Sequence, residues 1–186
     1  MRFPKSVALL ALVGLTASQG ASAQQQCVSG SEIASLFVYA VPPTLEAVKN
    51  SCDGQLAPDG FFARGSTKLS ARYVALQNDT WPKARRALLM AIASQQNKNG
   101  KKTQVQGLGG VDPLKMAEAL PDNVARPLVE TLIMQKVAEK VKPDQCRTLE
   151  RIFGAMAPFD PRDAGMLLGV AMPLVGLKDP KVCDDE

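Results

Sequence analysis

Residues 27–52 read CVSGSEIASLFVYAVPPTLEAVKNSC and indicate the fold class more clearly than any other stretch of the chain. Ser29 followed by Glu32 forms a capping box, in which two side chains satisfy backbone N–H groups at the start of a helix. Apolar residues then recur at the three- and four-residue spacing of a buried helix face. They are Ile33, Leu36, Phe37, Ala40 and Val41. This pattern predicts an amphipathic helix that begins near Ser29.

The proline pair Pro42-Pro43 is expected to end this helix, because the residue before a proline is driven out of the helical conformation. Pro43 can occupy the first position of a second, shorter helix that runs to about Ser51. The two helices would then form a helical hairpin over residues 29–51.

A second hairpin is predicted near the C-terminus. The apolar spacing of residues 146–156 indicates one helix, and Asp160-Pro161 opens a last helix that runs to about Gly176. Proline is well tolerated in the first turn of a helix, where its missing N–H has no intrahelical partner in any case.

The four cysteines lie at the open ends of these two predicted hairpins. Because the ends of an antiparallel hairpin are neighbours, we predict two disulfides, Cys27–Cys52 and Cys146–Cys183. Four cysteines allow three connectivities. Packing of the two chain termini against each other would exchange the partners.

The rest of the chain is read as further helices separated by turns. Helical periods or caps occupy residues 66–76, 80–96, 112–120 and 122–141, and a single helical turn is expected at Phe61-Phe62 within a loop of residues 53–65. The glycine-containing stretch 97–111 has neither period and is predicted to be a mobile loop. We therefore predict an all-α fold of seven or eight helices that forms a single domain over residues 24–186.

The N-terminus has the three parts of a cleavable secretory signal. Arg2 and Lys5 supply positive charge, residues 7–15 are apolar, and Ala21-Ser22-Ala23 is a small-residue cleavage motif before Gln24. We predict that residues 1–23 are a signal peptide and that the mature chain is periplasmic or secreted. The apolar run is half the length that a membrane-spanning helix needs, and no transmembrane segment is expected in the mature chain.

The chain contains no histidine. Serine and cysteine hydrolases of the triad type need an imidazole to accept and return a proton, and most zinc sites use imidazole as a ligand. Both classes are therefore excluded. We expect no cofactor, no metal site and no catalytic residue.

Basic residues are concentrated between Gly60 and Val111, where nine of them are opposed only by Asp79, for a net charge of +8. These candidate anion-binding residues are Arg64, Lys68, Arg72, Lys83, Arg85, Arg86, Lys98, Lys101 and Lys102. Such a surface would bind anionic envelope components or an acidic protein. The alternative is a solvated basic face with no ligand. Nucleic acid is not expected as a partner, because no aromatic ladder accompanies the charge.

These observations predict an exported, non-catalytic binding or envelope-accessory protein. The alternative is a carboxylate-dependent hydrolase of cell-wall glycan, since glycoside cleavage generally requires two carboxyl groups. The closely grouped carboxylates before the basic segment are Glu46, Asp53 and Asp59.

Overall fold

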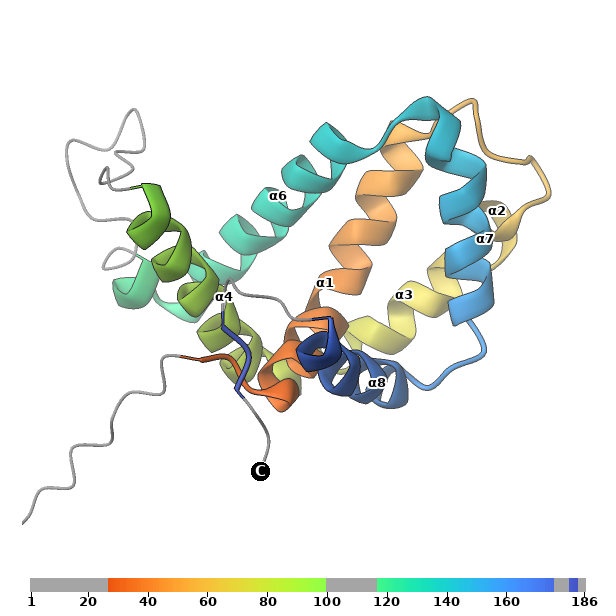
Figure 1. The fold of residues 1–186 in the computed structure, drawn as a ribbon. Coiled ribbons are helices and arrows are strands. Elements are labelled where there is room, and N and C mark those ends of the chain that lie inside the picture. Colours follow the sequence, from red (N-terminus) through yellow and green to blue (C-terminus); the bar gives the residue numbers. More distant parts are fainter. Residues whose placement is uncertain (1–26, 100–116, 176–180, 184–186) are drawn as a thin grey trace, which may run out of the picture.

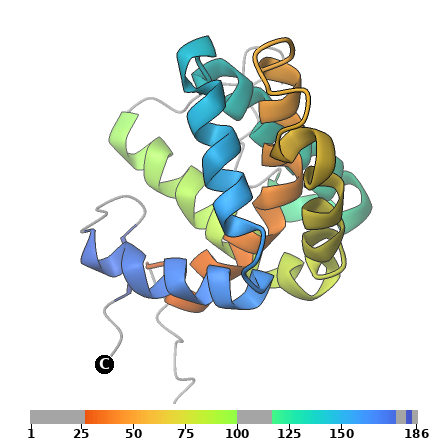
Figure 2. The same ribbon diagram turned by 90° about the vertical axis from the view of Figure 1, so that its right-hand side faces the viewer.

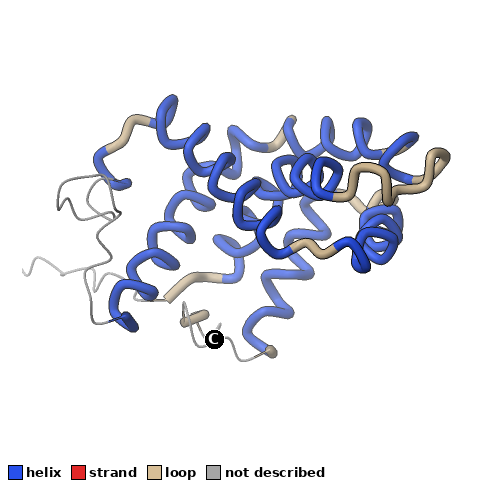
Figure 3. Tube along the Cα trace, turned by 90° about the horizontal axis from the view of Figure 1, so that it is seen from above, coloured by secondary structure: helices blue, strands red, loops and turns tan. Residues whose placement is uncertain are grey.

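The computed structural model describes residues 27–99, 117–175 and 181–183. These ranges contain seven complete α-helices, one short 3-10 helix and no strand (Figures 1 and 3). Residues 117–119, the described part of the helix predicted over 112–120, are also helical. The predicted all-α class is confirmed. The elements in order are α1 (Gly30–Ser51), α2 (Phe61–Arg64), α3 (Ser66–Val74), α4 (Gln77–Asn99), α6 (Asp122–Lys140), η1 (Pro143–Gln145), α7 (Cys146–Met156) and α8 (Pro161–Leu174).

Helix α1 is the central element, and α3, α4, α6 and α8 all pack against it (Figure 1). Its first turn has the predicted capping box, in which the Ser29 hydroxyl accepts from the Glu32 N–H and Glu32 accepts from the Ser29 N–H. The helix then continues for 22 residues through Pro42 and Pro43. The predicted break and the first hairpin are therefore wrong.

Two features explain why α1 continues through the proline pair. Pro43 removes the N–H that would bond to the Tyr39 carbonyl four residues earlier, but the Gln77 side-chain amide donates to that carbonyl at 3.3 Å. Apolar side chains on both sides of the pair, including Val41 and Leu45, are also buried. Packing along the whole helix outweighs the local preference of the prolines.

The disulfides in the structure are Cys27–Cys183 and Cys52–Cys146, with Cα–Cα distances of 5.0 and 5.6 Å. The predicted pairing of Cys27 with Cys52 and of Cys146 with Cys183 is wrong. The reason is the unbroken α1: its 22 residues separate Cys27 from Cys52 by about 33 Å. A disulfide cannot join Cα atoms more than about 7 Å apart.

Each disulfide therefore joins parts of the chain that are far apart in sequence, and the two disulfides lie at opposite ends of α1. At the N-terminal end, the short segment around Val182 pairs with Val28 as an isolated parallel bridge, and the Val28 N–H donates to the Lys181 carbonyl at 2.8 Å. At the C-terminal end, Cys52 meets the start of α7. Both sulfur-bearing residues of the Cys52–Cys146 bond are completely buried.

Most of the other predicted elements are confirmed with small shifts. The loop after Cys52 contains Gly54 with a φ of 76°, and α2 supplies the single expected helical turn. Helix α4 begins three residues before the predicted start and extends to Asn99, so residues 97–99 are helical where a loop was predicted. The predicted signal peptide and the stretch 100–116 lie outside the described residues.

The buried side chains form three clusters around α1. One lies between α1, α3 and α7 and includes Val48, Leu69 and Tyr73. A second joins α1, α4 and α6 around Tyr39 and Trp81, whose ring centroids are 4.9 Å apart. The third surrounds Val28 at the N-terminal end of α1.

Helix α8 crosses the N-terminal half of α1 (Figure 2) at close range because its contacting face is made of glycine. A Cβ atom added at Gly169 would lie 2.4 Å from the Gly30 carbonyl oxygen, and one added at Gly165 would lie 2.9 Å from that of Ala34. The opposite face of α8 is apolar and exposed. Its side chains are Met166, Leu167, Val170 and Leu174.

Candidate functional site

Three of the predicted anion-binding residues are engaged in contacts within the fold. Arg72 donates to the backbone carbonyls of Ala157 and Phe159 and so attaches α3 to the turn between α7 and α8. The guanidinium of Arg85 pairs with Asp122 at 2.6 Å and donates to the Leu120 carbonyl at 2.7 Å. The guanidinium groups of Arg72 and Arg85 are therefore both bound to acceptors that lie far from them in the sequence.

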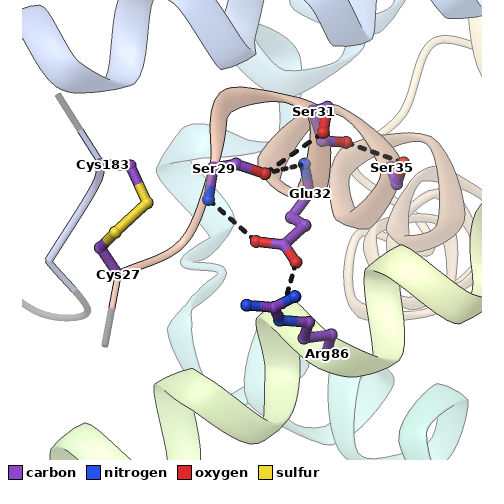
Figure 4. Close-up of polar contacts among 7 residues, drawn as sticks. All are labelled: Cys27, Ser29, Ser31, Glu32, Ser35, Arg86 and Cys183. Atoms are coloured by element: carbon purple, nitrogen blue, oxygen red, sulfur yellow. Dashed lines mark hydrogen bonds and ion pairs between the residues drawn. A yellow bond between two sulfur atoms is a disulfide. The ribbon is translucent and has the colours of Figure 1, made fainter. Parts of the chain in front are cut away.

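Arg86 is the third. Its Nε lies 3.0 Å from Oε1 of Glu32, and the other Glu32 oxygen accepts from the Ser29 N–H (Figure 4). The Glu32 side chain is only 8% exposed. A buried carboxylate requires a paired charge, so Arg86 neutralises the capping box and connects α4 to the start of α1.

The remaining described members are Arg64, Lys68 and Lys83, which are exposed on three different helices. Arg64 lies 3.8 Å from Asp59. The side chain of Lys98 and all of Lys101 and Lys102 lie outside the described residues. A continuous anion-binding surface therefore stays a prediction, and four of its nine members, Arg64, Arg72, Arg85 and Arg86, already have intramolecular partners.

A groove of about 630 Å³ runs along the C-terminal half of α1. Residues 42–50 of α1 form its floor, residues 66–74 of α3 form one wall, and Glu130 and Met134 of α6 form the other. Gln77 lies at the start of α4 and also lines it. Helices α3 and α6 both pack on α1 and lie on either side of it in Figure 1, and side chains of all three helices line the groove.

Tyr39 holds two of the polar side chains that line this groove. Its hydroxyl donates to Oε1 of Glu130 at 3.0 Å, and its carbonyl accepts from the Gln77 amide at 3.3 Å. Tyr39 itself is 1% exposed. Burial, followed by the hydrogen bond to Glu130, raises the pKa of the Tyr39 hydroxyl well above its usual value of 10.0, so it stays a donor across the physiological range.

The prolines contribute to the same site. Pro42 and Pro43 both line the groove, and Pro43 is the residue that leaves the Tyr39 carbonyl without its helical donor. The Gln77 side chain takes the place of that donor. Pro43, which the sequence analysis expected to follow a helix break, therefore helps to position the Gln77 amide at the edge of the groove.

The candidate hydrolase carboxylates are not brought together. Glu46 lines the groove, whereas Asp53 and Asp59 lie in the loop after Cys52 and are not among the groove residues. Glu130, which the sequence analysis did not single out, is the second carboxylate of the groove. Within the described ranges, no three metal-ligating side chains are grouped in a way that could hold an ion.

Comparison with known proteins identifies no relative: no family model matches the chain, and neither a curated protein nor a solved structure is significantly similar to it. Any functional conclusion must therefore come from the groove and from the framework around it.

Proposed function

We propose that this chain is an exported, non-catalytic binding protein that holds a small ligand in the groove between α1, α3 and α6. The observation that supports this function is the fixed position of Glu130 and Gln77, both hydrogen-bonded to the buried Tyr39. Binding sites characteristically combine an apolar lining with a few polar groups in fixed positions. Polar side chains that are already held lose little entropy when a ligand arrives.

The disulfides support the exported location. All four cysteines are paired, and stable disulfides are typical of the periplasm and the extracellular space. None of the helices in the described ranges combines the length and apolarity needed to cross a bilayer. We propose that residues 1–23 direct export and are removed before Gln24.

The proposal is tested by filling the groove. Ala71 lines the groove on α3, so Ala71→Trp is expected to abolish retention of small molecules from a low-molecular-weight extract of the native envelope, measured by native mass spectrometry. Ala155→Trp is the matched control, because Ala155 is also an exposed helical alanine but lies on α7 outside the groove. Equal retention by both variants would contradict binding in the groove.

The presence of two carboxylates in the groove favours one alternative, a carboxylate-dependent glycan hydrolase. Glu46 on α1 and Glu130 on α6 face the same hollow, as acid and base must do in a glycosidase. Turnover of purified wall glycan by the parent protein, lost in both Glu46→Gln and Glu130→Gln, would establish the enzyme. Ligand retention without turnover would establish the binding protein.

A further inference from the structure

We infer that the groove ligand is an organic cation, with a primary ammonium group bound at Glu130 and Gln77 and an alkyl stem lying along α1. This inference rests on the proposed binding function and names the chemical class of the ligand.

The first argument comes from hydrogen-bonding capacity. One oxygen of Glu130 accepts from Tyr39, but a carboxylate has about four acceptor positions, so it can accept further donors. Gln77 uses its NH2 group to bond to the Tyr39 carbonyl, so the carbonyl oxygen is the part of its amide that remains to bind a ligand. Both groups therefore offer acceptors at this end of the groove. An ammonium group, with three N–H donors, matches them.

The second argument comes from charge. Two carboxylates, Glu46 and Glu130, line the groove against a single ammonium group, that of Lys49. Glu130 bonds to Tyr39 and so lies at the Pro42 end, whereas Lys49 is seven residues further along α1, about 10 Å away. Among the side chains that line the groove, the Pro42 end therefore carries the Glu130 carboxylate and no ammonium group, and we call it the acidic end. Arg126, one turn before Glu130 on α6, lies over the Trp81 ring and donates to Asn78. A cation is the ligand that the charge of the lining favours.

The third argument comes from the apolar lining beside these acceptors. Pro42 on the floor, Val74 on α3 and Met134 on α6 supply hydrocarbon surface next to Glu130. Val74 is 50% exposed. An alkyl stem would cover these side chains while its ammonium group reaches the carboxylate, in the way that a lysine side chain packs its methylenes and exposes its charge.

Calorimetric titration of the mature protein with three probes of similar length tests the inference. Diaminopentane should bind saturably, whereas pentanediol and glutarate, the neutral and anionic counterparts, should not. Glu130→Gln should weaken diaminopentane binding about tenfold, because the charge-assisted bond is lost while an amide oxygen still accepts from Tyr39. Glu139→Gln is the matched control on the same helix, since Glu139 is exposed and pairs with Lys136 away from the groove, and it should leave affinity unchanged.

The outcomes separate the inference from the proposed function. If diaminopentane does not bind but Ala71→Trp still abolishes retention of an extract ligand, the cation inference is overturned and the binding function remains. Equal weakening by Glu130→Gln and Glu139→Gln would mean that net charge alone attracts the cation, which also overturns it. If no extract ligand and no probe binds, both fail.

Discussion

Replacing Cys52 and Cys146 together with alanine should lower the free energy of unfolding by about 3–5 kcal/mol. The bond closes a loop with a sequence separation of 94, and such a cross-link restricts the unfolded chain strongly. Both residues are 0% exposed, so the substitution also leaves a space in the core between α1 and α7. Denaturant titration of the two proteins without reductant measures the difference.

The order of reduction provides the control for this prediction. Cys27 and Cys183 are half-buried, whereas Cys52 and Cys146 are inaccessible, so limited reductant should open Cys27–Cys183 first. Peptide mapping after partial reduction identifies which bond remains. A destabilisation below about 1 kcal/mol, or an unreduced peptide that links Cys27 to Cys52, would contradict the arrangement around α1.

The second prediction concerns the contact between α1 and α8. Gly169→Ala should destabilise the fold by about 1–3 kcal/mol, because the new Cβ would lie 2.4 Å from a backbone oxygen that cannot rotate away. The helices would have to separate along their whole contact. Thermal or urea unfolding of the variant against the parent protein provides the value.

Gly154→Ala on α7 is the matched control for this substitution. The nearest atom to its new Cβ would be the Phe61 Cβ at 3.5 Å, an ordinary contact. Alanine is better than glycine inside a helix by up to about 1 kcal/mol, so this variant should be as stable as the parent or more stable. If both substitutions had the same effect, close packing at Gly169 would not be what holds α8 in place.

Local signals in the sequence predicted local structure well. The capping box at Ser29 and the N-cap at Asp160 both act within a few residues, and each is present in the structure. The proline pair at 42–43 misled the prediction because what keeps α1 continuous lies far away. Gln77, the donor that replaces the missing N–H, is 38 residues from Tyr39. The predicted disulfide pairing was wrong for the same reason, because it assumed that the proline pair ends the first helix.

The candidate site was harder to predict from sequence. Counting charges found the basic residues but could not show that Arg72 bonds to Ala157, 85 residues away. The sequence analysis did not single out Tyr39, and its bond to Glu130 spans 91 residues. The residue spacings that predict helices and strands cannot reveal contacts between residues so far apart in the sequence. A proline pair within a long apolar period was the one local sign that α1 has an unusual surface at this point.

The most direct test of cation binding in the groove is a titration of isotope-labelled mature protein with diaminopentane, followed by amide chemical shifts. The largest saturable shifts should fall on residues that line the acidic end of the groove: Leu45, Glu46, Val74, Gln77, Glu130 and Met134. Shifts centred on the exposed apolar face of α8, or no saturable shift in any of these six amides, would contradict a cation site preformed by Tyr39.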